Sequence, residues 1–85
     1  MSDDFKPRVP LPLISVVVPC YNEEEVIGQT LAELDAFALS LTDYRVEFIF
    51  VDDGSRDGTL DILQEAALYN ASYRILSFSR NFGHQ

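Results

Sequence analysis

The sequence has very little cysteine, histidine and basic charge. It holds one histidine, His84, and one cysteine, Cys20. Because a disulfide needs two cysteines, none can form within its 85 residues. This fits a reducing compartment, and a lone cysteine of this kind is most often a small buried side chain rather than a nucleophile. Lysine and arginine number 6 against 14 aspartates and glutamates, which gives a net charge of −8. Because nucleic-acid binding needs a basic surface, we expect no nucleic-acid partner.

Long apolar runs are also missing. No stretch approaches the roughly 18–20 apolar residues that a helix needs to cross a bilayer, although 47% of the residues are hydrophobic. The first residues, MSDDFKPRVPLP, combine acidic side chains with prolines and suit neither a signal peptide nor a transit segment. We expect an extended tail over residues 1–12, one small domain over residues 13–85, and a cytoplasmic location for this fragment.

Three apolar runs rich in β-branched and aromatic residues predict strands. The continuous run ISVVVP is typical of a strand buried on both faces, as in a parallel sheet. Pro19 closes this run and is expected to end the strand, because proline has no N–H for the ladder. The three predicted strands cover residues 14–19, 46–51 and 73–79.

Two helical patterns separate these strands. Asn22 followed by Glu25 fits a capping box, which predicts that the first helix begins there, and apolar side chains recur at helical spacing from Ile27 to Leu41. The second helix is predicted from 57–59 to Asn70. The alternation β-α-β-α-β predicts an α/β fold with parallel strands, right-handed crossovers and strand order 3-2-1, the half-unit of nucleotide-binding folds.

Polar loops follow all three predicted strands, with the sequences PCYNEEE, DDGSRDG and SRNFGHQ. Ligands of open parallel sheets bind beyond the carboxyl ends of the strands, so three polar loops at that edge predict a site. A dinucleotide site is disfavoured, because the first loop has three glutamates and no glycine before Gly28. A phosphate-accepting receiver domain would need its acidic pair after the first strand, whereas Asp52 and Asp53 follow the second.

The segments ISVVVPCYNEEEVI, EFIFVDDGSRDGTLDIL and LSFSRNFGHQ resemble, in this order and spacing, the start of family 2 glycosyltransferases with the GT-A fold. The resemblance covers about residues 14–85 and extends to the polyprenyl-phosphate sugar transferases of the dolichol-phosphate mannosyltransferase type. It implies a three-layer β-α-β-α-β half of a Rossmann-like GT-A fold. It also implies a nucleotide-sugar-binding portion of an enzyme that moves a sugar from a UDP- or GDP-linked donor to a polyprenyl phosphate.

The resemblance implies roles for particular positions. Tyr21 would stack on the base and Glu23 would bond the base or ribose. One of the two adjacent aspartates would organise the turn, and Asp53 is favoured over Asp52 as the acceptor for a ring N–H of the base. Arg80 would bring positive charge to the diphosphate. The full set of implied nucleotide-sugar-binding residues is Pro19, Tyr21, Asn22, Glu23, Val51, Asp52, Asp53, Arg80, Asn81 and Gly83.

Each role has a purely structural alternative. Asn22 and Glu25 can serve only to cap a helix, Tyr21 can be a packing residue, and Arg80 can be a surface salt-bridge partner. For residues 57–59, Asp-Gly-Thr, turn and cap chemistry is the favoured interpretation.

The metal-binding carboxylates of the family are not in this sequence. The family holds Mg²⁺ or Mn²⁺ with an Asp-x-Asp element after a fourth strand, and no Asp-x-Asp occurs in residues 14–85. We therefore expect no catalytic residue and no metal site in this chain, which would be an inactive N-terminal part of a longer, membrane-associated enzyme acting on the cytoplasmic face. The flank of the first strand would be an open sheet edge, which predicts self-association. The alternative function is a non-catalytic remnant or self-associating module without a ligand.

Overall fold

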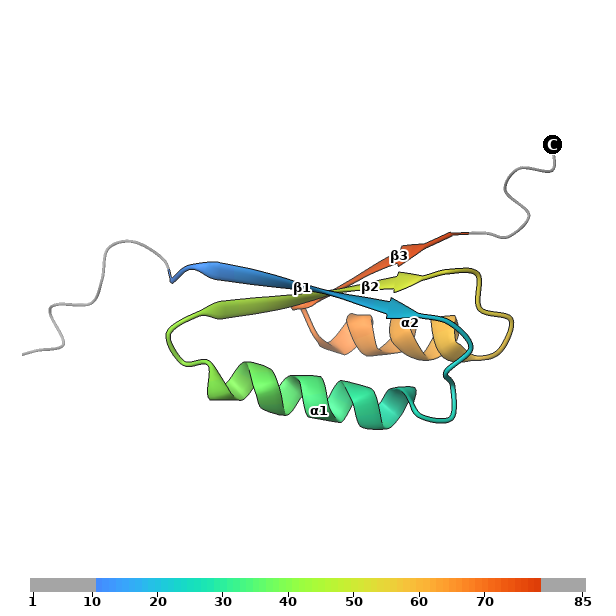
Figure 1. Cartoon of the computed structure of the whole chain (residues 1–85), viewed down its shortest axis with the longest axis horizontal. Coiled ribbons are helices and arrows are strands. Elements are labelled where there is room, and N and C mark those ends of the chain that lie inside the picture. Colours follow the sequence, from blue (N-terminus) through green and yellow to red (C-terminus); the bar gives the residue numbers. More distant parts are fainter. Residues whose placement is uncertain (1–10, 79–85) are drawn as a thin grey trace, which may run out of the picture.

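The fold is a single parallel sheet with two helices. The structure is a computed structural model that describes residues 11–78. The elements are β1 (Leu13–Cys20), α1 (Ile27–Ser40), β2 (Arg45–Asp52), α2 (Thr59–Tyr69) and β3 (Tyr73–Ser77). All strand pairs are parallel and their order is β1-β2-β3, which confirms the order predicted from the alternation of elements (Figure 1). Neither helix of this part of the chain is long and apolar enough to span a membrane.

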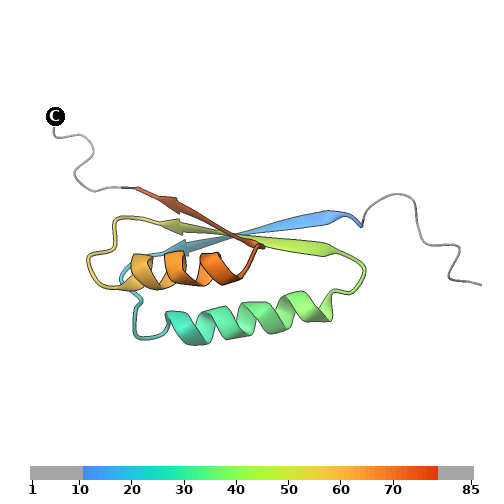
Figure 2. The same cartoon turned by 180° about the vertical axis from the view of Figure 1, so that it is seen from behind.

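Both helices lie on the same face of the sheet, as the front and rear views agree (Figure 1, Figure 2). In a sheet ordered β1-β2-β3 the two crossovers run in the same direction, so right-handed connections place both helices on one side. The described residues therefore supply two of the three expected layers. The expectation that the first strand is buried on both faces is wrong within residues 11–78, because Val17, on the open face, is 61% exposed.

The core lies between the sheet and the helices and is rich in aromatic rings. The ring centroids of Phe50 and Tyr73 are 5.0 Å apart at an interplanar angle of 73°, an edge-to-face contact. The Tyr73 hydroxyl donates a 2.6 Å hydrogen bond to Asp35 of α1. Burial, followed by this bond, raises the pKa of Tyr73 above its usual value. The buried hydrophobic side chains are Cys20, Ile27, Phe48, Phe50, Leu63 and Tyr73.

Helix α1 begins at Ile27, later than predicted. Asn22 has a φ of 50°, in the left-handed region, and therefore cannot start a right-handed helix. The N-cap position is occupied by Val26, which makes no side-chain capping bond. The predicted capping box of Asn22 and Glu25 is wrong, because the Asn22 side chain instead accepts a 2.8 Å bond from the N–H of Arg56 in another loop.

Strand β1 continues through Pro19, which was expected to end it. The Cys20 carbonyl accepts a 3.1 Å hydrogen bond from the Asp53 N–H, so the even-numbered residues of β1 direct their backbone groups toward β2. Odd-numbered residues such as Pro19 direct theirs toward the outer edge of β1, which pairs with no other strand among residues 11–78. The missing N–H of proline therefore breaks no ladder bond at this position.

Candidate functional site

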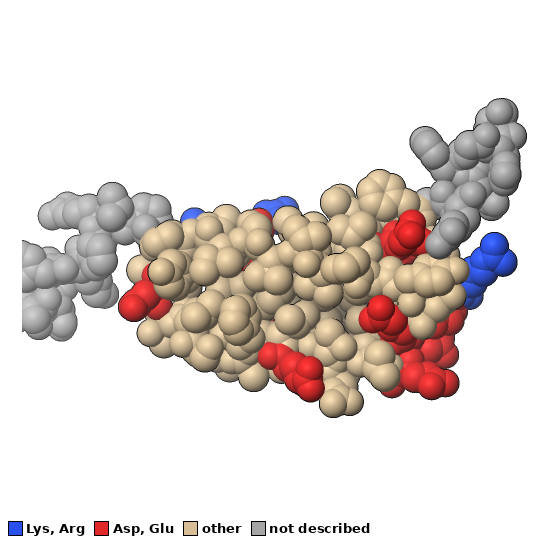
Figure 3. Space-filling view, viewed as in Figure 1, with Lys and Arg blue, Asp and Glu red and all other residues tan. Residues whose placement is uncertain are grey.

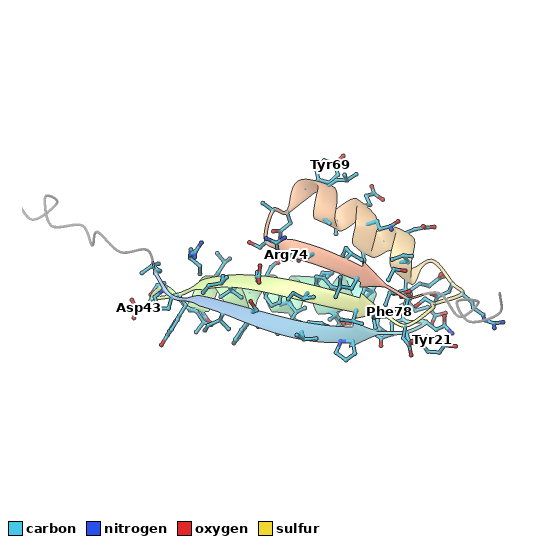
Figure 4. All side chains as sticks on the ribbon, turned by 90° about the horizontal axis from the view of Figure 1, so that it is seen from above. Tyr21, Asp43, Tyr69, Arg74 and Phe78 are labelled. Atoms are coloured by element: carbon cyan, nitrogen blue, oxygen red, sulfur yellow. The ribbon has the colours of Figure 1, made fainter. Side chains whose placement is uncertain are left out.

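The carboxyl ends of the three strands point to one edge of the sheet (Figure 1). Loop 1, residues 21–26, follows β1, and loop 2, residues 53–58, follows β2. Viewed onto the open face, Tyr21 and Phe78 lie at this edge and Asp43 lies at the opposite edge (Figure 4). The third predicted loop, which carries Arg80, Asn81 and Gly83, lies outside the described residues.

Backbone and side-chain groups join the two loops directly. The Ser55 hydroxyl accepts the Asn22 N–H at 2.8 Å, and the Thr59 hydroxyl accepts the Glu23 N–H at 2.7 Å. Topology had predicted that these loops meet, and the bonds between them confirm it. The five bonds join Asn22 with Ser55 and Arg56, Glu23 with Thr59, and Glu24 with Asp57 and Gly58.

Two glycines allow loop 2 to follow this course. Gly54 has a φ of 78°, which side-chain-bearing residues rarely adopt. At Gly58, a Cβ atom would lie 2.9 Å from a carboxylate oxygen of Glu24, whose bond to the Gly58 N–H requires this close approach. A larger residue at position 58 would therefore displace the end of the Glu24 side chain and weaken its bond to the backbone of loop 2.

The adjacent aspartates occupy different environments. Asp52 is 1% exposed, and its carboxylate accepts the N–H of Ser55 at 3.0 Å and the Ser55 hydroxyl at 2.5 Å. Asp53 is exposed at the rim, where its N–H bonds to the Cys20 carbonyl. Asp52 therefore organises the turn. The ligand contact favoured for Asp53 stays a prediction.

An acidic depression of about 490 Å³ lies beside loop 1. Acidic side chains gather at this end of the molecule in the space-filling view (Figure 3). An unshielded phosphate would be repelled there. Among residues 11–78, no group of three His, Cys, Asp or Glu side chains is arranged to hold a metal ion. The depression is lined by Asn22, Glu23, Glu24, Glu25, Val26 and Asp57.

The remaining predicted residues frame the same edge. Pro19 pairs with Val51 in the register of β1 and β2, on the open face next to the loops.

Cys20 is 2% exposed and points to the helices, as expected for a small buried side chain. Burial, with smaller contributions from the charges of Glu23 and Asp52, raises the pKa of Cys20 to about 11. The thiol is therefore protonated at neutral pH and unsuited to nucleophilic attack.

Ser55 and Thr59 are the residues that sequence reasoning missed as members of this edge. The sequence favours turn and cap chemistry for Thr59, and it predicts no role for Ser55. The spacings Asp52-x-x-Ser55 and Asp57-x-Thr59 are typical of side chains that bond the local backbone. These spacings could have predicted the bonds of Ser55 and Thr59 with the nearby aspartates. Their bonds to loop 1 join residues 33 and 36 positions apart, and no local pattern predicts them.

A parallel β-α-β-α-β sheet with joined polar loops at its carboxyl edge has the arrangement of the N-terminal half of a Rossmann-like fold. Residues 15–85 match the family described as Glycosyl transferase family 2. The chain belongs to this family, which confirms the resemblance of its three motifs.

Curated relatives include lipid-linked sugar transferases. The chain is 46% identical over 71 residues to the uncharacterized glycosyltransferase YkcC of Bacillus subtilis, covering 84% of the chain and 22% of the relative. It is 39% identical over 75 residues to an undecaprenyl-phosphate 4-deoxy-4-formamido-L-arabinose transferase of Pseudomonas syringae, with coverages of 87% and 22%. It is 41% identical over 75 residues to a prophage bactoprenol glucosyl transferase homolog of Escherichia coli, with coverages of 85% and 23%. The chain thus spans about a fifth of the length of these relatives.

Proposed function

We propose that this chain is the nucleotide-sugar-binding portion of a glycosyltransferase that moves a sugar from a UDP- or GDP-linked donor to a polyprenyl phosphate. The observation that carries the proposal is the joined edge of loop 1 and loop 2 in a member of this family. The acceptor class is supported by relatives named for undecaprenyl phosphate and bactoprenol. A longer parent enzyme of this class would work at the cytoplasmic face of a membrane.

The proposed contacts divide the nucleotide between the loops. Tyr21 and Asp53 are both exposed at the edge. The ring of Tyr21 would stack on the face of the nucleobase, and the carboxylate of Asp53 would accept a ring N–H at the edge of the base. Glu23 would bond the ribose or base, while Asn22 and Asp52 would act through the backbone N–H groups of loop 2 that their side chains hold in place. Pro19 and Val51 would support the base from the sheet, and Arg80, Asn81 and Gly83 would approach the diphosphate.

The Mg²⁺ or Mn²⁺ implied by the family does not fit the described residues. Within residues 11–78, no three His, Cys, Asp or Glu side chains are grouped so that they could hold a metal ion. With no Asp-x-Asp in residues 14–85 either, we propose that the chain alone binds a donor without transferring its sugar. No step of the proposed function passes through a metal in this part of the chain.

Titration of UDP and GDP into the purified chain tests this function. We expect one of the two to bind, and we expect Asp53→Ala to weaken that binding by about tenfold, because a base N–H would lose its charged acceptor. Isothermal titration calorimetry or shifts of amide resonances would measure the affinity. The matched control is Asp43→Ala, an exposed aspartate at the opposite edge of the sheet (Figure 4). Failure of both nucleotides to bind the unmodified chain would instead favour a ligand-free remnant.

Self-association is a second proposed property, and it rests on the outer edge of β1, which no other strand of the described part of the chain covers. Leu13, Ser15 and Val17 direct their N–H groups away from β2, so this edge can accept another strand. Leu13 and Val17 also expose 48% and 61% of their surface beside it. Two copies pairing along β1 would place these apolar side chains next to those of the partner strand.

Light scattering over a range of concentrations tests this pairing. We expect dimers of the unmodified chain at high concentration and monomers of Val17→Pro, which removes an outward N–H without breaking a bond to β2. Val17→Thr keeps the N–H and the branched side chain, so it should still dimerise. A chain that stays monomeric at the highest concentration contradicts the proposal.

A further inference from the structure

We propose that Ser55 and Thr59 are positioning residues, whose hydroxyl groups set the backbone of loop 1 for the bound nucleotide through two parallel relays. Each relay runs from a carboxylate through a hydroxyl to a backbone N–H of loop 1. The identity of the ligand rests on the function proposed above, whereas the relays are defined by the hydrogen bonds of the chain itself.

The first relay starts at Asp52. The Ser55 hydroxyl donates to an Asp52 carboxylate oxygen at 2.5 Å and accepts the Asn22 N–H at 2.8 Å. A hydroxyl has a single hydrogen, so donation to Asp52 leaves only its lone pairs for Asn22. Because Asp52 is 1% exposed, water competes poorly for its oxygens, and the direction of the relay is set.

The second relay starts at Asp57. The Thr59 hydroxyl donates to an Asp57 carboxylate oxygen at 2.6 Å and accepts the Glu23 N–H at 2.7 Å. Thr59 is fully buried, with 0% exposure, so its χ1 angle and hydroxyl direction are held by packing. The hydrogen bond from Thr59 is the largest cause that keeps the pKa of Asp57 below its usual value.

The two relays hold consecutive backbone groups of loop 1. Asn22 and Glu23 follow Tyr21, so anchoring their N–H groups fixes the directions in which the neighbouring side chains leave the backbone. Loop 1 needs such anchors, because Asn22 is held in the left-handed conformation and three successive glutamates repel one another. A loop fixed before binding has less freedom to lose when the nucleotide arrives.

Amide hydrogen exchange on the 85-residue chain tests the relays, and nucleotide titration tests their purpose. Thr59→Val removes the hydroxyl at nearly constant volume, and Thr59→Ser keeps it. We expect the Glu23 amide to exchange at least about tenfold faster in Thr59→Val and to return close to the original rate in Thr59→Ser. The affinity for UDP or GDP should follow the same order, while the amides of β2 keep their protection.

Ser55→Ala and Ser55→Thr form a second pair of variants at a half-buried position. If Thr59→Val fails to fold, this pair still shows whether a hydroxyl group anchors the N–H of Asn22. Unchanged exchange at Asn22 and Glu23 in the variants without a hydroxyl would overturn the proposal. Faster exchange of the loop 1 amides together with an unchanged affinity for the nucleotide would also overturn it. If the unmodified chain binds neither nucleotide, the proposed function fails, and the exchange rates still decide whether the relays hold loop 1.

Discussion

Phe50→Ala is expected to unfold the chain at room temperature. Phe50 is fully buried, and its ring lies 6.2 Å from that of Phe48 and 5.0 Å from that of Tyr73. Truncating a buried phenylalanine costs about 3–5 kcal/mol, since the cavity left behind closes only in part. A single core of this size supplies only about 3–5 kcal/mol of net stability. Circular dichroism during thermal unfolding would report the loss as the absence of a cooperative transition.

Phe78→Ala is the matched control for this substitution. Phe78 follows β3 and is 54% exposed, so the same truncation there removes little buried surface. We expect it to leave the unfolding temperature within a few degrees of the original value. A cooperative transition of Phe50→Ala at a similar temperature would show that the aromatic cluster does not hold the two layers together.

Asp52→Ala and Asp53→Ala are expected to differ in their effects on the stability of the chain. Removing the Asp52 carboxylate leaves the N–H and hydroxyl of Ser55 without their acceptor, and bonds to a charged group contribute about 1.5–3 kcal/mol. We expect a loss of about 2–3 kcal/mol in the free energy of unfolding. Asp53→Ala, at an exposed position, should stay within about 0.5 kcal/mol of the original stability. Urea denaturation would measure both changes.

Asp52→Asn helps to separate the causes of this loss. An amide keeps the size and one acceptor oxygen of the carboxylate, so its effect should lie between those of the original residue and alanine. Equal destabilisation by Asp52→Ala and Asp53→Ala would contradict the division of roles between the two carboxylates.

The arrangement of the elements could be predicted from the sequence because it depends on short-range patterns. Each strand pairs with the next strand along the chain, and a right-handed crossover fixes where the intervening helix lies. Alternation within β2 also separates the two carboxylates. Phe48, Phe50 and Asp52 share the helix-facing side, which leaves Asp53 to the rim.

The start of α1 could not be predicted in this way, because the partners of Asn22 lie far along the chain. Its N–H and its side-chain oxygen bond to Ser55 and Arg56, which are 33 and 34 positions away. An asparagine before three glutamates reads locally as a helix cap, and only the folded sheet brings the competing partners within reach. The same limit hid the contacts that Thr59 makes with loop 1.

The bonds between loop 1 and loop 2 fix the length of loop 2. Ser55, Asp57 and Thr59 stand at alternate positions, and all three bond to the backbone of loop 1. One inserted or deleted residue would move at least one of these side chains by about 3.3 Å, which exceeds the tolerance of a hydrogen bond. Surface loops generally accept insertions during divergence. The connection at residues 41–44 has that freedom, whereas the segment from Asp52 to Thr59 should keep a constant number of residues in every homologue that retains this edge.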